Sequence, residues 1–326
     1  MSNANSLKNI LSTLLLALAL NFPCIAQSPL AHKHIAITQF VTHGALDTVR
    51  TALLEELEKK GYKEGENLTI TFDNAHGNAT TASQIARKFL GLKPDVIVAI
   101  ATPSALSMVK TIKNSIPIVF SAVTDPVRAG LVSSLQNHPQ NVTGVMDAPP
   151  IKEQMGFIKT LLPAAKTIGI IYNPGDNGSV SSLEVIREEA KAQGFALVEV
   201  TPVKSSDIQA ALLQLVGQVD AIYVPLDNMI VSAMKTVSAI SLKHKIPLFA
   251  ADSGSVESGA LACVGYSYHL AGLKTGDMAE EILKGKKSSE IDIASPDKID
   301  VFINRNALET LKISLPESLR SQARFY

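Results

Sequence analysis

The sequence has no tryptophan, only two cysteines, and no excess of charge of either sign. Aromatic residues make up 5% of its 326 residues, and 30 basic side chains match 30 acidic ones. A balanced charge lacks the electrostatic footprint of proteins that bind nucleic acids or anionic membranes. We therefore predict no nucleic-acid partner, and few aromatic side chains are available to stack on a ligand.

The apolar run at the N-terminus is too short for an ordinary membrane span. It covers residues 10–22 and is typical of a secretory signal peptide. Small residues at Cys24 and Ala26 predict cleavage after Ala26, which gives a signal peptide of residues 1–26 and a periplasmic protein. We do not expect lipidation of Cys24, because Pro23 stands where a lipoprotein signal has a small residue. A retained membrane anchor is the alternative.

The shortage of cysteine also excludes a disulfide framework, since Cys263 would be the single cysteine of the mature chain. Its apolar surroundings favour a buried, inert thiol. Motifs of metalloproteases, phosphate-binding loops, serine hydrolases and dinucleotide sites are absent. His43, His76 and His269 are too scattered to predict a metal site. We predict no catalytic residues, no metal and no cofactor.

What the chain does contain is a regular alternation of apolar strands and amphipathic helices. This pattern is typical of right-handed βαβ units and mostly parallel sheets. The expected strands lie at 34–40, 68–77, 95–100, 116–123, 141–146, 167–174, 196–203, 221–227, 246–252 and 299–305. The expected helices lie at 49–62, 80–92, 104–113, 151–162, 181–194, 206–216, 229–244 and 270–284.

The pattern also repeats. Asp95 opens a strand that is followed by a second one beginning Ile-Pro, and Asp220, 125 residues later, opens the same sequence of features. We predict an α/β protein with two doubly wound parallel-sheet domains joined by a hinge. The N-terminal domain would comprise residues 33–147 plus about 267–295, and the C-terminal domain 148–266 plus about 296–326.

Candidate ligand-binding residues follow the predicted strands, because ligands of parallel sheets gather beyond the carboxyl ends of the strands. Most of them are small and polar, and a few are aromatic. They are Phe40, His43, Asn74, Thr102, Ser104, Asp125, Asn173, Asn177, Gly178, Ser179, Asp227, Asn228, Asp252 and Tyr266.

Their chemistry suits a zwitterion. The turn at 172–179 precedes a helix whose N-terminus could bind a carboxylate, although Ser179 could simply cap that helix. Asp227 and Asp252 could bind an ammonium group, or could cap the helices that follow them. For Asp125, which precedes a proline, a turn or cap role is favoured. Phe40, Tyr266 and Tyr268 are candidates for an apolar pocket, with core or hinge packing as the alternative.

The ordered segments of the chain resemble the solute-binding proteins of ABC transporters, in particular the exported members for aromatic amino acids such as tryptophan and phenylalanine. The resemblance runs from about His34 to Ile313. It rests on ITQFVTHGALD, GYKEGENLTITFDNAHGN, KPDVIVAIATPSA, IPIVFSAVTDPVRAGLV, NVTGVMD, IGIIYNPGDNGS, VDAIYVPLDN and IPLFAAD.

The resemblance implies a type I periplasmic-binding fold that closes on a small ligand and docks on a membrane permease. By position, Thr102, Ser104, Ser179 and the 173–178 turn lie on the carboxylate side. Asp227, Asn228 and Asp252 lie near the amine. We expect a monomer that is not an enzyme.

Two segments depart from the family pattern. Residues 42–44 replace an acidic residue and a proline, and residues 251–253 replace an Asp-Thr-Asp-like run. Both segments border the predicted cleft, so the ligand's side chain stays open. A sugar, a nucleoside or a peptide-like molecule is the alternative ligand. A sensor that signals to a membrane receptor is the alternative role, and an enzyme on the same architecture is a third reading.

Overall fold

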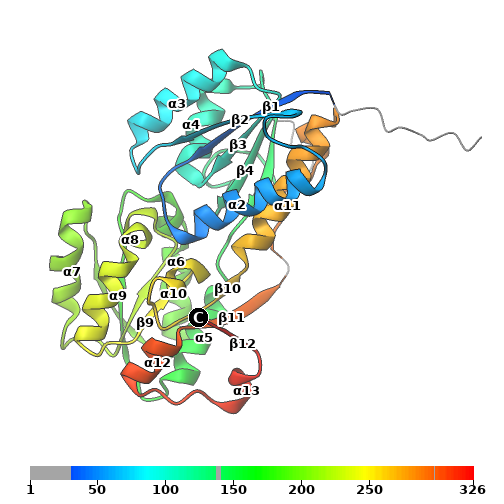
Figure 1. Cartoon of the computed structure of the whole chain (residues 1–326). Helices are drawn as coiled ribbons and strands as arrows, with labels where there is room; N and C mark the ends of the chain where they lie inside the picture. The colour runs from blue at the N-terminus through cyan, green and yellow to red at the C-terminus, as the bar shows by residue number, and fades with distance from the viewer. Residues whose placement is uncertain (1–30, 137–140, 297) are drawn as a thin grey trace, which may run out of the picture. The chain divides into compact units, whose positions relative to one another are not determined.

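The computed structural model describes residues 31–136, 141–296 and 298–326. The predicted signal peptide and its Cys24 lie outside these residues. No helix in the described ranges is both long enough and apolar enough to cross a membrane. The described strands form two separate sheets, each covered by helices (Figure 1).

The first sheet has five parallel strands in the order β2-β1-β3-β4-β5. They are β1 (Lys33–Gln39), β2 (Leu68–Asn74), β3 (Val96–Ile100), β4 (Ile118–Val123) and β5 (Val142–Met146). Helices α3 (Ala79–Leu92) and α4 (Thr102–Ile112) cover one face, and α2 (Gly44–Lys59) and α11 (Tyr268–Leu283) cover the other (Figure 1). We call this sheet with these four helices the first lobe.

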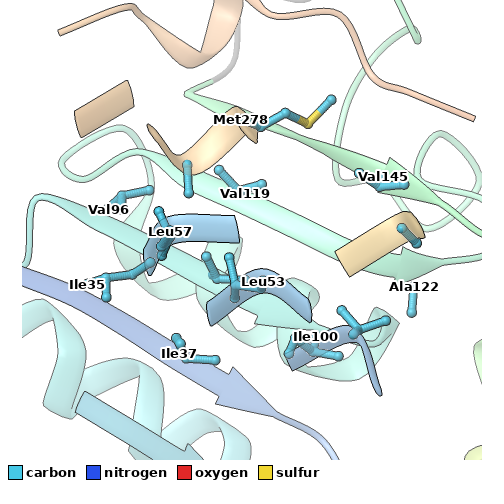
Figure 2. Packing of buried hydrophobic residues seen from close by; sticks show 14 of the residues in the cluster. Ile35, Ile37, Leu53, Leu57, Val96, Ile100, Val119, Ala122, Val145 and Met278 are labelled. Carbon is cyan, nitrogen blue, oxygen red and sulfur yellow. The ribbon is translucent and has the colours of Figure 1, made fainter. Parts of the chain in front are cut away.

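The central strands of the first lobe are unbroken apolar runs because both of their faces are buried. Side chains of all five strands meet α2 and α11 in one of the two apolar clusters of the lobe. Figure 2 shows Ile35, Ile37, Val96, Ile100 and Val119 of the sheet facing Leu53, Leu57 and Met278 of the helices.

The second sheet has the order β12-β11-β10-β9-β8-β6-β7, and β10 and β11 form its antiparallel pair. Its strands are β6 (Thr167–Ile171), β7 (Ala196–Val200), β8 (Ala221–Val224), β9 (Leu248–Ala250), β10 (Ala262–Tyr266), β11 (Ile299–Ile303) and β12 (Ala323–Phe325). The helices on it are α5 (Ile151–Leu161), α6 (Asn177–Ala192), α7 (Ile208–Leu215), α8 (Asn228–Ser232), α9 (Met234–Lys243), α10 (Ser253–Glu257), α12 (Arg305–Leu311) and α13 (Glu317–Arg320). We call this sheet with these helices the second lobe.

The fold class is therefore confirmed, while some boundaries differ from the prediction. The helix predicted at 181–194 already begins at Asn177, because the Asp176 carboxylate accepts hydrogen bonds from the Gly178 and Ser179 amides and caps it. The helix predicted at 229–244 is two helices separated at Ala233, where the backbone leaves the helical region. The short elements α10, β10 and β12 were not predicted.

Cys263 lies in β10 and is buried against Val256 and Phe302. Burial raises the pKa of its thiol, which keeps the sulfur protonated and unreactive. The prediction of a buried cysteine is confirmed.

The sequence repeat has a structural basis. Asp95 and Asp220 precede β3 and β8, and each accepts hydrogen bonds from the backbone at the start of the neighbouring strand. Asp95 binds the amide of His34 at 2.8 Å, and Asp220 binds those of Lys166 and Thr167 at 2.8 and 2.9 Å. Each aspartate thus fixes the start of two adjacent strands in its lobe.

The chain passes between the two sheets three times. It leaves the first sheet after β5, returns after β10 to form α11, and leaves again between Ala294, which bridges to Val145, and β11. Three short crossings are the arrangement expected of a hinge. Domain boundaries near residues 147, 266 and 295 remain our proposal for this chain.

Candidate ligand-binding site

A cavity of about 30 Å³ lies where strand ends and helix starts of both lobes meet. This volume holds one or two water molecules, or a group of the size of an ammonium ion. We call it the inner cavity. It is lined by His43, Leu46, Ala101, Thr102, Ala122, Thr124, Asp147, Gly178, Leu226, Asp227, Asn228, Val231, Asp252 and Tyr268.

Asp147 brings a buried carboxylate to the inner cavity from the first lobe. It follows β5 directly and accepts hydrogen bonds from the Tyr268 hydroxyl at 2.9 Å and the Thr124 hydroxyl at 3.1 Å. Burial raises the pKa of Asp147 to about 6, and the nearby Asp252 charge adds to this shift. The site therefore holds a carboxylate that has no cationic partner among the described residues.

Asp227 brings a second carboxylate, from the second lobe, and holds it with four hydrogen bonds. One oxygen accepts from the amides of Met229 and Ile230 and so caps α8. The other accepts from the Asn173 amide at 2.6 Å and the Ser179 hydroxyl at 3.0 Å. Burial, together with the neighbouring Asp176 charge, raises the pKa of Asp227 to about 7.

Asp252 is the third carboxylate at the inner cavity, and it too comes from the second lobe. It is 2% exposed and caps α10 by accepting hydrogen bonds from the Ser255 amide and hydroxyl. Capping and lining the cavity are thus compatible roles for both Asp227 and Asp252. None of the residues that line the inner cavity is a lysine or an arginine. The cavity is consequently strongly acidic and suited to a cation.

His43 faces these carboxylates from the start of α2. Burial lowers the pKa of its imidazole, and the charges of Asp252 and Asp47 only partly oppose this shift. Its Nδ1 atom is enclosed and has no hydrogen-bond partner among the described residues. A neutral imidazole leaves the three carboxylates without a compensating charge.

The start of α4 is one of two helix starts at the inner cavity that lack a side-chain cap, the other being the start of α2. No side chain caps α4, and its N-cap residue, Ala101, has a φ of 77° and a ψ of 150°, a region that residues other than glycine rarely adopt. Ala122 at the end of β4 also has a positive φ, 54°. Strained backbone at two neighbouring strand ends is a feature that clusters at ligand sites.

A larger cavity, of about 460 Å³, adjoins the inner one and shares Asn228 with it. We call it the outer cavity. Its first-lobe lining includes Phe40, Val41 and Pro103, and its second-lobe lining includes Asn173, Asn177 and Met229. Asn228 is held in place by Asp176, whose carboxylate accepts from the Asn228 amide at 3.1 Å and from its side chain at 2.8 Å.

The structure brings nine of the fourteen predicted site residues to the two cavities. Those at the inner cavity are His43, Thr102, Gly178, Asp227, Asn228 and Asp252, and those at the outer cavity are Phe40, Asn173, Asn177 and again Asn228. The five that line neither cavity are Asn74, Ser104, Asp125, Ser179 and Tyr266.

Three of these five have structural roles. Ser179 lies behind Asp227 and holds its carboxylate. Asn74 joins the Thr42 hydroxyl to the His76 amide, and Asp125 accepts from the Arg128 amide in a turn. Ser104 is fully buried, and its hydroxyl has no partner in the described part of the chain.

Asp147, Thr124 and Tyr268 are the polar lining residues of the inner cavity that are not among the predicted site residues. Asp147 follows the carboxyl end of β5 directly, so the rule that selected the other candidates applies to it as well. Tyr268 was predicted for an apolar pocket, with core or hinge packing as the alternative; its ring lies in the first-lobe apolar cluster, and its hydroxyl donates to Asp147. Within the described residues there is no cluster of three or more metal-ligating side chains.

Two parallel-dominated α/β sheets with a ligand-sized space at their strand ends define a solute-binding protein of the type I periplasmic-binding fold. The profile of the ABC transporter substrate binding protein family matches residues 34–325, and the chain belongs to this family. Members of this family are substrate-binding proteins and not enzymes.

Individual relatives agree with this assignment. A tyrosine-binding protein of Clostridioides difficile is 42% identical over 279 residues, which cover 86% of this chain and 81% of the relative. A conserved domain protein of Vibrio cholerae has a structure with 41% identity and a TM-score of 0.86, covering 90% of this chain and 99% of its own.

Two further solved structures differ in their bound state. A Streptococcus pneumoniae protein in complex with L-Trp is 30% identical, with a TM-score of 0.83, and covers 89% of this chain and 99% of its own. A ligand-free, open substrate-binding protein with adhesive properties from Clostridium difficile is 40% identical, with a TM-score of 0.69, over 90% of this chain and 99% of its own.

Proposed function

We propose that this protein is the extracytoplasmic binding component of an ABC importer and that its ligand is an aromatic amino acid, bound as a zwitterion. The observation that carries the proposal is the acidic inner cavity. Asp147, Asp227 and Asp252 line it, and no lysine or arginine does. A ligand ammonium group would supply the missing positive charge in a space of the right size.

The placement of these carboxylates also suggests how binding could drive closure. Asp147 belongs to the first lobe and Asp252 to the second, and the charge of Asp252 contributes to the raised pKa of Asp147. Ionised and without ligand, the two lobes repel each other at this point. An ammonium group between them turns the repulsion into attraction, so the ligand binds the closed form better than the open one.

The ligand carboxylate is assigned to the start of α4. This helix end has no side-chain cap, and the Thr102 hydroxyl lies beside it at the inner cavity. The turn at 173–178 is a weaker candidate, because the amides of Gly178 and Ser179 already donate to Asp176 and that of Asn173 donates to Asp227. A carboxylate at an uncapped helix N-terminus gains from the helix dipole.

Two comparisons support an amino acid as ligand. One relative is named for tyrosine, and another was crystallised with L-Trp. The structure superimposes better on the L-Trp complex than on the open, ligand-free relative, although the latter has the higher sequence identity. This difference supports a closed, ligand-bound-like arrangement of residues 32–326. Export through a cleaved signal peptide, a monomeric state and docking on a permease are part of the same proposal.

Native mass spectrometry of protein purified without refolding tests the ligand class, because a tightly bound ligand stays with the protein. Calorimetry of ligand-stripped protein against the twenty amino acids, and against sugars and nucleosides, then gives affinities. We expect the tightest binding for an aromatic amino acid. Tight binding of a sugar or nucleoside, with no amino acid bound, would refute the proposal. Uptake of the labelled ligand, lost on deletion of the gene, separates import from sensing.

A further inference from the structure

The inner cavity is too small for a whole amino acid. Its volume of about 30 Å³ is filled by an ammonium group and a water molecule. Small-molecule sites are usually clefts of about 300 to 1,000 Å³. The outer cavity, at about 460 Å³, lies within that range, and Asn228 lines both cavities.

The lining of the outer cavity mixes apolar and polar groups at different depths, since Asp176 is buried, Asn173 is half-buried and Val203 is exposed. Phe40, Pro103 and Met229 are half-buried and present an aromatic ring, a pyrrolidine ring and a thioether. His76, Asn177 and Ser205 are exposed and present hydrogen-bonding groups. Such a lining matches a flat apolar body with a polar tip, the character of a tyrosine or tryptophan side chain.

The apolar lining is also divided between the lobes. Phe40 follows β1 and Pro103 lies in α4, both in the first lobe, whereas Met229 lies in α8 of the second lobe. A ring placed between them would contact both lobes. Sulfur-aromatic and aromatic-aromatic contacts would then form together as the lobes close.

We infer that the outer cavity is the side-chain subsite of the ligand and that Met229, which lines it together with Phe40, determines its preference for an aromatic side chain with a polar tip. The inference rests on the proposed function. It adds that the outer cavity binds the side chain of the ligand, whereas the acidic inner cavity binds its ammonium group.

Met229→Ala and Met229→Trp test the inference in opposite directions. We expect Met229→Ala to weaken L-tyrosine binding about tenfold and to narrow the gap between L-tyrosine and L-leucine. Met229→Trp fills the outer cavity, so it should abolish L-tyrosine binding while L-alanine and L-serine still bind at least as well as to the wild type. Leu213→Ala, an exposed apolar truncation outside both cavities, is the control and should change nothing.

The outcomes separate the two proposals. If the wild type binds L-tyrosine tightly and both Met229 variants bind it equally well, the subsite assignment is overturned and the proposed function stands. If the wild type prefers L-alanine or L-serine to aromatic amino acids, the subsite assignment is likewise overturned, while a zwitterion ligand stands. If the wild type binds no amino acid, the proposed function and this inference fall together.

Discussion

Replacing Asp147 by asparagine should weaken ligand binding and at the same time stabilise the ligand-free protein. The ionised Asp147 is costly in the folded state, because burial raises its pKa from 3.8 to about 6. A shift of two units corresponds to about 3 kcal/mol at a pH above both values. Asparagine removes this cost but satisfies only one of the two donors, Tyr268 and Thr124, which loses about 1 kcal/mol.

The net expectation is a gain of about 2 kcal/mol in the unfolding free energy of the ligand-free variant at pH 8. The sign follows from the raised pKa. A carboxyl group whose folded pKa lies above its unfolded value favours the neutral form, so folding loses stability as the pH rises from about 4 to about 6. Above that range the full cost is present, and the asparagine variant avoids it.

Binding should change in the opposite direction. A buried ammonium-carboxylate pair that loses one charge weakens binding by about 3 kcal/mol, or about 100-fold in Kd. Urea unfolding of stripped protein and calorimetry of ligand binding, both at pH 8, measure the two effects. Asp125→Asn is the matched control, since that aspartate lines neither cavity and asparagine can still accept from the Arg128 amide.

The reasoning would be refuted by an Asp147→Asn protein that binds the ligand within twofold of the wild type. It would also be refuted by a variant that is less stable than the wild type without ligand, because Asp147 would then be a structural anchor and not an unpaired charge. The control protects the test against a general effect of removing an acidic side chain.

The remaining predictions concern pH, a structural carboxylate and lobe closure. The pKa values of Asp147 and Asp227 are raised to about 6 and about 7, so a bound ammonium group should displace protons from these carboxyl groups. Ligand affinity should therefore fall as the pH is lowered from 8 to 5, and calorimetry in two buffers at pH 6.5 should detect proton release. An affinity that does not depend on pH would contradict this prediction. Asp227→Ala leaves four hydrogen-bond donors without their acceptor, so it should lower the free energy of unfolding by about 3 kcal/mol as well as weaken ligand binding. Urea unfolding measures the first effect, and an unchanged free energy of unfolding would show that the carboxylate has no structural role. A Cβ at Gly254 of the second lobe would lie 2.5 Å from the Ala45 amide nitrogen of the first lobe, so Gly254→Ala should keep the lobes apart and weaken ligand binding at least tenfold. Gly156→Ala is the control, because a Cβ there meets no atom within 4 Å, and it should leave binding unchanged. Small-angle scattering that shows ligand-induced compaction of the Gly254→Ala protein would contradict a closure contact at Gly254.

Much of the fold could be predicted from the sequence because its signals are local. Apolar runs such as 96–100 and 118–123 are buried on both faces, which made them recognisable as central parallel strands. The repeat centred on Asp95 and Asp220 also had a local cause, the fixing of neighbouring strand starts. The predicted ends of elements were wrong where a single side chain determines the end. The start of α6 is an example, because Asp176 caps this helix and a later serine does not.

The candidate site could be predicted only as a set of positions. The rule that ligands gather beyond strand ends found Asp227, Asp252 and Thr102, and it would have found Asp147 had β5 been treated like the other strands. It could not distinguish a residue that lines the cavity from one that supports it. Ser179 and Asp227 lie 48 residues apart in the chain, and their hydrogen bond exists only because α6 and α8 start side by side.

The sequence by itself determined that this chain forms two α/β sheets, because hydrophobic periodicity is a property of neighbouring residues and the pattern occurs twice. The solute-binding class was implied by the resemblance of its motifs to a known family. Only the tertiary structure decided the charge of the site. Three carboxylates from distant segments line one small cavity with no lysine or arginine beside them, and burial there raises the pKa of two of them. Desolvation and charge repulsion depend on distances in space, and those distances are set when the two lobes pack around the cavity.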